Sequence, residues 1–385
     1  MPSLRFSGFV LPLLLLAVIT VPAGCGRSKG EDSSGRAAWH PLPVHYAGGF
    51  LLDTAAGIVR AQVVNPWQGD KKERFTYLII RDNKRDQRPQ AAVVVRAPVR
   101  RVVCTSTTHV AFLSALGRSS SIVGISGRDY ICDSTLRRRI AAGGVKDIGY
   151  DRNMNYELIV QLRPDVVFLY GIGPAVKGTA ARLASLNIPA VIVGDYLERT
   201  PLGRAEWIRF FGAFFGMTGG PARFADSLAA RYDSLQQQVR DTARRPLVMT
   251  GLPWNEVWYV PGNGSLTAAF IRDAGGRYVW NDIASGDAVP MDIEKVFRKA
   301  GDADIWINCG TASSLQEITA TDERLGLFRP VKTGRVYNND ARLNETGGND
   351  YWESGVVHPD IILEDLQKIF GGNGERGLNY YRKLK

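Results

Sequence analysis

The 385-residue chain has few residues of the kinds that hold metal ions or build disulfide frameworks. It contains four cysteines and four histidines, and no two cysteines form a C-x-x-C pair. A structural zinc site is therefore not predicted. The motifs H-E-x-x-H, G-x-S-x-G and the P-loop are also missing. Gly372-x-Gly374-x-x-Gly377 fits the dinucleotide-binding pattern, but it follows a predicted helix instead of a strand and is discounted. Outside the N-terminus, no apolar run reaches the roughly 18 residues that a spanning helix needs.

The N-terminus has the pattern of an export signal. An apolar run from Phe9 to Val21 is followed by small residues and then by Cys25. Such a short run, ending in small residues, indicates that residues 1–25 are a signal rather than a membrane span. A cysteine directly after Ala-Gly resembles a bacterial lipobox, although Pro22 stands where that motif usually has leucine. We therefore expect lipidation of Cys25, with an ordinary cleaved signal as the alternative, and a flexible tether over residues 26–39.

The charge balance favours anionic small molecules over nucleic acid. The formal net charge is +10, which can attract anionic ligands or surfaces. No dense basic stripe interleaved with aromatic residues is present, and an exported chain meets little nucleic acid. A nucleic-acid partner is therefore not expected.

Three cysteines follow the signal, namely Cys104, Cys132 and Cys309. An odd number cannot pair completely. Cys104 and Cys132 could form a disulfide in an oxidising compartment, but the sequence leaves this open. Cys104 and Cys309 lie in apolar runs, which favours buried, unreactive thiols.

Residues 40–98 predict a small β-rich addition ahead of the main fold. Short strand-like runs are separated by polar turns. These runs are Phe50–Leu52, Ile58–Val64, Phe75–Ile80 and Ala91–Val95. We interpret them as a small antiparallel sheet.

The rest of the chain alternates between short apolar strands and helices over residues 99–200 and again over 246–385. This alternation is typical of parallel α/β folds. Between the two segments, residues 201–245 are helical, and five apolar residues share one helical face: Phe224, Leu228, Tyr232, Leu235 and Val239. The sequence therefore predicts an α/β fold with two lobes joined by one long helix, which we expect to restrict hinge motion.

A short internal echo supports the two-lobe prediction. Asn155 and Asp292 each stand two residues before a glutamate, Glu157 and Glu294. In both copies an apolar helix follows, and an aspartate precedes a buried strand. The match is short but is consistent with a duplication.

These segments resemble the Fe/B12-type periplasmic binding proteins of ABC importers, from about residue 99 to 370. The resemblance is carried by Asn155-Tyr-Glu-Leu-Ile-Val-Gln-Leu-Arg-Pro-Asp165-Val-Val, by Arg101 to His109 and by Ala274-Gly-Gly276. The tail from Gly348 to Trp352 resembles versions from Bacteroides-type bacteria. The resemblance implies a monomeric, non-enzymatic protein of the periplasm or cell envelope, anchored to a membrane through Cys25. It also implies an ABC permease with its ATPase as partners.

The family presents one surface glutamate per lobe to arginines of the importer, and by position these are Glu157 and Glu294. Two exposed carboxylates on a rigid body can fix docking by charge pairing. The alternative is that each is an ordinary acidic residue in the first turn of a helix, which the helix dipole favours.

Candidate ligand contacts follow the carboxyl ends of the predicted strands, where ligands of α/β folds bind. Aromatic rings offer large rigid surfaces to a flat macrocycle or catecholate, and arginines can pair with ligand carboxylates or hydroxamates. By analogy with the family we expect Tyr150, Tyr170 and Tyr259 to contact ligand; by position we add Thr107, His109, Arg128, Arg342 and Trp254. Each could instead be ordinary packing or a surface ion pair, and His109 alone at a helix start is more often structural.

No histidine pair has a direct metal-site spacing, so no metal site is assigned and a preformed complex is the expected ligand. The expected function is that of an extracytoplasmic binding lipoprotein of an ABC importer. Its ligand would be an iron–siderophore, haem or cobalamin, and the basic charge favours an anionic iron complex slightly. A carrier without its own importer is the alternative, and a secreted hydrolase is a more distant one.

Overall fold

A computed structural model describes residues 38–69, 73–81, 93–150, 153–240, 245–372 and 377–385. Cys25, the predicted signal and nearly all of the predicted tether lie outside these ranges. Residues 39–385 belong to one compact unit. Within the described ranges, none of the helices combines the length and apolar character that crossing a membrane requires.

The N-terminal addition is a five-stranded sheet in the order β1-β2-β3-β4-β5. Its strands are β1 (His40–Pro41), β2 (Phe50–Ala55), β3 (Ile58–Val64), β4 (Arg74–Arg81) and β5 (Val93–Ala97). The first four strands pair antiparallel, as the sequence predicts, but β5 pairs parallel to β4. The prediction of a purely antiparallel sheet was therefore wrong at this edge. One face of the sheet packs on helix α6 (Trp207–Phe214) through Phe50, whose ring lies 4.9 Å from that of Trp207.

The N-terminal lobe contains a parallel five-stranded sheet in the order β10-β9-β6-β7-β8. Its strands are β6 (Val102–Cys104), β7 (Ile122–Ile125), β8 (Lys146–Asp147), β9 (Val166–Leu169) and β10 (Ala190–Ile192). Its helices are α1 (Thr107–Ala115), α2 (Ser134–Ala141), α3 (Tyr156–Leu162) and α4 (Val176–Ser185). Strands β6, β7, β9 and β10 are buried along their whole length, as expected where helices cover both faces of a parallel sheet.

The C-terminal lobe repeats this architecture, with strands in the order β13-β11-β15-β16-β17. The strands are β11 (Leu247–Thr250), β13 (Arg277–Tyr278), β15 (Ile305–Ile307), β16 (Val336–Asn338) and β17 (Arg382–Lys383), and only β17 is antiparallel. The helices are α8 (Leu266–Asp273), α9 (Ile293–Ala300), α10 (Leu315–Thr321), α11 (Arg329–Lys332) and α12 (Pro359–Phe370). The strand predicted at Val257–Val260 does form, but as β12 (Val257–Pro261) it pairs with β14 (Ala288–Asp292) in a separate antiparallel ladder.

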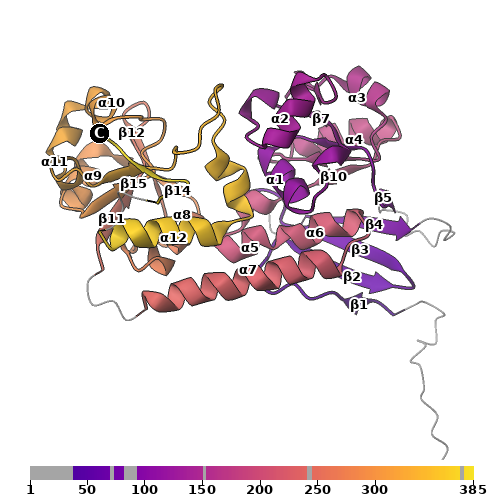
Figure 1. Cartoon of the computed structure of the whole chain (residues 1–385), viewed down its shortest axis with the longest axis horizontal. Helices are drawn as coiled ribbons and strands as arrows, with labels where there is room; N and C mark the ends of the chain where they lie inside the picture. Colours follow the sequence, from indigo (N-terminus) through magenta and orange to yellow (C-terminus); the bar gives the residue numbers. More distant parts are fainter. Residues whose placement is uncertain (1–37, 70–72, 82–92, 151–152, 241–244, 373–376) are drawn as a thin grey trace, which may run out of the picture. The chain divides into compact units, whose positions relative to one another are not determined.

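The linking segment consists of α5 (Pro201–Ala205), α6 (Trp207–Phe214) and the 20-residue helix α7 (Gly219–Gln238). Ala225 of α7 packs in the core of the N-terminal lobe, whereas Leu228 and Tyr232 pack in that of the C-terminal lobe. Figure 1 shows α7 running along α5, α6 and α12, its packing partners. The predicted long helix shared by both lobes is thus confirmed.

Candidate ligand site

The carboxyl ends of the N-terminal strands are tied together by hydroxyl groups. The backbone N–H of Tyr170, after β9, donates to Thr105 Oγ1, after β6, over 2.7 Å. The ring of Tyr170 meets that of Tyr196 edge to face at 5.1 Å, and the Tyr196 hydroxyl donates to the Gly171 carbonyl over 3.1 Å. Burial, followed by the neighbouring Tyr170, raises the pKa of Tyr196 to about 12. The Tyr196 phenol is therefore neutral at pH 7.

Tyr150 and Tyr130 form a second aromatic pair around Gly127. The Tyr150 hydroxyl oxygen lies 1.6 Å from the position that a Cβ on Gly127 would occupy, and a ring carbon of Tyr130 lies 3.1 Å from it. Gly127 also has a φ of 70°, so only glycine fits here. Tyr150 remains 49% exposed and Tyr130 52% exposed. The two rings therefore offer apolar surface next to β7 and β8.

Below the strand ends lies a buried polar group centred on Asp195. The Asp195 carboxylate is fully buried. Its Oδ1 accepts from the Thr108 hydroxyl and its Oδ2 accepts from Arg204 Nε, each over 3.2 Å. The ion pair between Asp195 and Arg204 fixes the orientation of the buried guanidinium, because Asp195 accepts from its Nε. The Arg204 side chain is only 11% exposed.

His109 is not at the surface of this region. It is fully buried, and neither ring nitrogen has a hydrogen-bond partner among the described residues. Its ring packs against Phe168 and Phe211 at centroid distances of 6.2 and 5.7 Å. Burial lowers the pKa of His109 to about 4, so the ring is neutral at pH 7. The expected ligand contact of His109 is therefore not supported, and Ser106, rather than His109, caps α1.

A polypeptide arm, residues 341–353, crosses from the C-terminal lobe to the N-terminal lobe (Figure 1). Asn344 Nδ2 donates to the carbonyls of Asp129 and Ile131, each over 2.8 Å. Leu343 and Asn349 pair as an isolated antiparallel bridge, so the arm doubles back on itself. These contacts fasten the tip of the arm to the loop after β7.

The base of the arm is fastened by Glu353. Its carboxylate accepts from the backbone N–H groups of Cys132 and Asp133 over 2.8 and 2.7 Å. Glu353 is 2% exposed, and burial raises its pKa to about 7. Next to it, Thr107 Oγ1 donates to the Trp352 carbonyl over 3.4 Å. The two lobes are therefore joined by hydrogen bonds at both ends of the arm.

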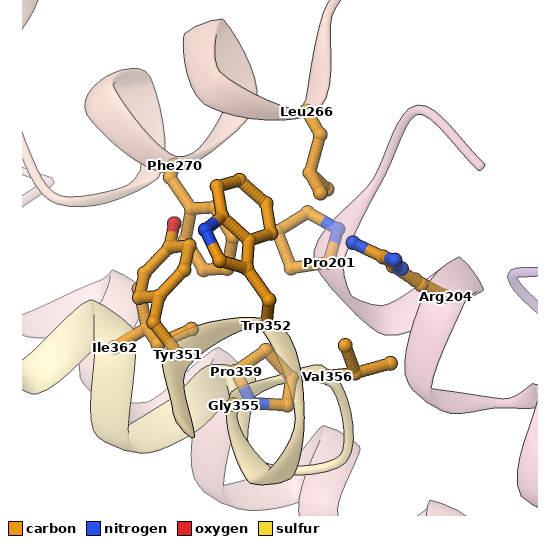
Figure 2. A pocket seen from close by; sticks show the side chains of 10 residues that line it. All are labelled: Pro201, Arg204, Leu266, Phe270, Tyr351, Trp352, Gly355, Val356, Pro359 and Ile362. Atoms are coloured by element: carbon orange, nitrogen blue, oxygen red, sulfur yellow. The ribbon is translucent and has the colours of Figure 1, made fainter. Parts of the chain in front are cut away.

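A small hollow of about 20 Å³ lies where the arm, the linking segment and the C-terminal lobe meet (Figure 2). It is lined by Pro201, Arg204, Leu266, Phe270, Tyr351, Trp352, Gly355, Val356, Pro359 and Ile362. Arg204 is the only charged residue among these. The Trp352 side chain is 50% exposed, and its backbone contacts the N-terminal lobe through Thr107. None of the lining residues comes from the N-terminal lobe, so this hollow is our candidate for the C-terminal side of a ligand site at the junction.

The other expected ligand residues do not line the hollow. Trp254 and Tyr259 are 68% and 47% exposed in the C-terminal lobe. Arg342 is paired with Asp350 at 2.8 Å, and Arg128 lies 3.5 Å from Asp129. Thr107 touches the rim through Trp352, while Tyr150 and Tyr170 belong to the aromatic pairs above. Sequence reasoning missed Arg204, Trp352 and Glu353, because nothing local marks a residue as part of an interlobe contact.

The N-terminal addition also reaches the second lobe. Gln68, between β3 and β4, donates to Asp287 Oδ1 over 3.2 Å. Arg199, after β10, lies so close to Gly286 that a Cβ there would be 2.3 Å from its guanidinium carbon. The lobes are therefore bridged away from the arm as well.

The two predicted docking residues are both exposed, in the first turns of α3 and α9. Asn155 and Asp292 cap these helices by accepting from the N–H groups three residues on. Glu294 pairs with Arg324 at 2.7 Å, which lowers the pKa of Glu294. Among the described residues, Glu157 has no ion-pair partner. The two carboxylates are thus equivalent in position but not in charge environment.

The described residues contain no cluster of three or more acidic, histidine or cysteine side chains that could hold a metal ion. Cys104, Cys132 and Cys309 are all free, and Cys104 and Cys309 are buried. The disulfide left open by the sequence is therefore not formed here. Burial, together with Glu353, raises the pKa of Cys132 to about 12, which makes its thiol unreactive at neutral pH.

Two parallel α/β lobes, one shared long helix and a hollow at their junction define a two-lobe binding protein of the helical-backbone type. The chain belongs to the periplasmic binding protein family, which matches residues 102–343. Members of this family bind substrates for ABC importers and are typically not enzymes.

Individual relatives agree with this assignment. An uncharacterized lipoprotein of Methanocaldococcus jannaschii is 27% identical over 84% of this chain and 81% of its own. A periplasmic haem-binding protein of Pseudomonas aeruginosa has a TM-score of 0.55 at 16% identity, covering 74% of this chain and 98% of its own. An ABC-type Fe³⁺-hydroxamate transport protein of Saccharomonospora viridis has a TM-score of 0.52 at 18% identity, covering 71% and 94%. The two solved structures support the fold.

Proposed function

We propose that this protein captures a metal chelate between its two lobes and delivers it to an ABC permease. The observation that carries the proposal is the hollow at the junction of the lobes, whose lining comes from the linking segment, the C-terminal lobe and the arm. Exposed aromatic side chains stand after strands of both lobes, including Tyr130, Tyr150 and Trp254. Such rings suit flat or aromatic ligands, because they bury large area at little entropic cost.

Family membership supports the same proposal. The fold occurs in proteins whose names specify haem or ferric hydroxamates, and an iron–siderophore, haem or cobalamin is the ligand class we propose here. The bridges between the lobes, through Glu353, Asn344 and Gln68, favour a site that changes little in width on binding. Such preorganisation lowers the entropic cost of capture.

The test is a titration of the purified protein with haem, ferrioxamine and cyanocobalamin, followed by absorbance and tryptophan fluorescence. Trp352 is half exposed beside the hollow, so ligand absorbing above 320 nm should quench fluorescence on binding. We expect one of the three to bind with a Kd of micromolar or lower, and a Trp352→Phe variant to lose part of the quenching. Absence of binding by all three chelates contradicts the proposal.

Docking on the permease is proposed to use Glu157 and Glu294. Both are exposed first-turn residues of equivalent helices, and a homologous pair of carboxylates can fix orientation on a basic membrane partner. The relatives named as lipoproteins support anchoring of this chain at Cys25. Metabolic labelling with palmitate, compared between the natural chain and Cys25→Ser, tests the anchor.

The alternative of a carrier without its own importer makes a different prediction for the same residues. If the protein only stores or passes on its ligand, charge reversal at both glutamates leaves uptake by the cells unchanged. Loss of uptake with unchanged chelate affinity supports delivery to a permease.

A further inference from the structure

The arm is anchored at its base in the C-terminal lobe. Tyr351 is buried in the core of that lobe, and its ring meets those of Tyr380 and Tyr381 at centroid distances of 6.2 and 5.8 Å. The Asp350 carboxylate pairs with Arg342 at 2.8 Å, and the Asp350 N–H donates to the Arg342 carbonyl over 3.0 Å. The two ends of the arm are therefore joined to each other and to the C-terminal lobe.

The tip of the arm, residues 343–348, is held on the N-terminal lobe by exposed polar contacts. Besides the bonds of Asn344 to the loop after β7, the Thr346 hydroxyl donates to the Asp129 carbonyl. Leu343, the only large apolar residue of the tip, is 52% exposed. A segment that buries little apolar surface and depends on exposed hydrogen bonds opens locally at low cost in free energy. The tip can therefore leave the N-terminal lobe while the base stays in place.

The tip lies over a strand end at which a ligand is expected. Asp129 and Ile131 follow β7, and ligands of α/β folds bind outside the carboxyl ends of strands. Between them stands Tyr130, which is 52% exposed and belongs to the aromatic pair with Tyr150. Gly348 is so close to this loop that a Cβ on it would lie 2.4 Å from the Tyr130 carbonyl oxygen. A ligand approaching the end of β7 from the C-terminal lobe therefore meets the tip.

The room beside the arm is too small for a chelate. The hollow next to Trp352 has a volume of about 20 Å³, roughly the space of one water molecule, whereas small-molecule sites take roughly 300–1,000 Å³. Figure 2 shows the Trp352 ring among the side chains that line this hollow. The spacing of the lobes is held independently of the arm, by α7 and by the contact of Gln68 with Asp287. Additional room must therefore come from the arm rather than from the lobes.

We propose that the arm is a strap whose tip detaches from the loop after β7 to admit a ligand and then closes over it, while its base stays in the C-terminal lobe. The identity of the ligand rests on the proposed function, but the opening belongs to the protein before any ligand is bound. Because binding requires the open form, association is slowed by the fraction of molecules in which the tip is closed. The strap delays both entry and escape without changing the distance between the lobes.

The first test locks the tip with a reversible disulfide. Asp129→Cys and Thr346→Cys are combined in the full chain, with Cys132→Ser to prevent mispairing, and association of haem, ferrioxamine and cyanocobalamin is followed by stopped-flow absorbance. Oxidation should slow association of the chelate that binds at least about tenfold, and a reductant should restore it. Each single cysteine variant is a control, because it cannot form the bond. Unchanged association in the oxidised double variant overturns the strap.

The second test releases the tip and needs no new disulfide. Asn344→Ala combined with Thr346→Ala removes the bonds to the Asp129 and Ile131 carbonyls, so association and dissociation should both become about threefold faster or more. Asn263→Ala is the matched control, because the Asn263 amide also donates to a backbone carbonyl, over 2.9 Å, but outside the arm. Unchanged rates in the release variant, or an equal change in the control, overturn the strap.

The third test reads the opening without a ligand. Amide hydrogen exchange of the tip, measured by mass spectrometry, should proceed through local opening, become faster in the release variant and become slower in the locked one. Exchange of the tip only through global unfolding overturns the strap even if a chelate binds, and it leaves the proposed function standing. If no chelate binds to any form, the proposed function fails, and exchange alone decides whether the tip opens.

Discussion

Asp165 and Asp304 make the same contact in the two lobes. Each precedes a buried strand, β9 or β15, and each carboxylate accepts from the backbone N–H of the residue that begins the neighbouring segment. Both also donate their own N–H back to the carbonyl of that residue, Arg101 or Leu247, over 2.8 Å. With β9 matched to β15, the order β10-β9-β6-β7 matches β16-β15-β11-β13. The short sequence echo therefore corresponds to four strands in the same spatial order.

Removing these carboxylates should destabilise the protein. In Asp304→Ala the Leu247 N–H loses its side-chain acceptor, and in Asp165→Ala the N–H groups of Arg100 and Arg101 lose theirs. We expect each substitution to lower the free energy of unfolding by about 1–2 kcal/mol, measured by urea denaturation. Asp302→Ala is the control, because Asp302 is exposed and two residues from Asp304. An equal loss of unfolding free energy in Asp302→Ala would contradict the structural role of Asp165 and Asp304.

The docking carboxylates should differ in their sensitivity to charge reversal. Glu157→Arg removes an unpaired charge, whereas Glu294→Arg also leaves Arg324 facing a like charge. We expect both variants to reduce uptake of chelate by cells and to leave chelate affinity unchanged. Arg324→Ala frees Glu294 from its internal partner, so it should raise affinity for a basic permease surface and make uptake more salt-sensitive. Reduced uptake in Arg324→Ala instead indicates that Arg324 itself contacts the permease.

Local patterns predicted most of the fold, because strands and helices of this class have local signatures. Helix α3 begins at a residue after the cap Asn155 and ends before Arg163, as its sequence indicates. Strand β7 matches its apolar run from Ile122 to Ile125. The parallel pairing of β5 was missed, because strand direction depends on the connection and not on the residues of the strand.

The site was predicted less well, because it is made by residues far apart in the chain. Glu353 and Cys132 are 221 residues apart, and the hollow joins residues from position 201 to 362. His109 was assigned to the ligand because it follows a hydroxyl-rich loop. Its helix α1 is buried around almost all of its circumference, so no periodic pattern could show which side of the helix faces the ligand.

The attachment of the arm should depend on pH through Glu353. Burial raises the pKa of this carboxyl to about 7, and Asp350 and Asp133 also act to raise it. A carboxyl whose pKa is higher in the folded state than in the unfolded state stabilises the fold while it is protonated. This stabilisation is complete below the unfolded value near 4.5 and is lost as the pH rises through 7. We expect the free energy of unfolding to fall over this window relative to Glu353→Gln, by up to about 3 kcal/mol. If the unfolding free energies of the unchanged protein and Glu353→Gln depend on pH in the same way, the raised pKa of Glu353 is contradicted.

The N-terminal addition should depend on the buried carboxylate of Glu206 for part of its attachment, beside that of Glu198, which accepts from the N–H groups of Gly48 and Gly49. Glu206 accepts from the backbone N–H groups of His45, Tyr46 and Ala47, over 2.7 to 3.0 Å, and is 2% exposed. Glu206→Ala leaves these donors without their acceptor, which should cost about 3 kcal/mol or more. Limited proteolysis should then cleave the segment around residues 42–49 faster than in the unchanged protein.

Glu256→Ala serves as the comparison for Glu206→Ala, because Glu256 is an exposed acid in the turn before β12. It should leave the proteolysis rate unchanged. Since Gln68 of the addition touches Asp287 of the C-terminal lobe, loosening of the addition should also weaken one bridge between the lobes. Glu206→Ala should therefore bind chelate more weakly, whereas Gln68→Ala alone should change affinity less than threefold, within the ~0.5 kcal/mol expected of an exposed contact. If Glu206→Ala is cleaved faster but binds chelate with unchanged affinity, attachment of the N-terminal addition does not influence the ligand site, and the proposed coupling is contradicted.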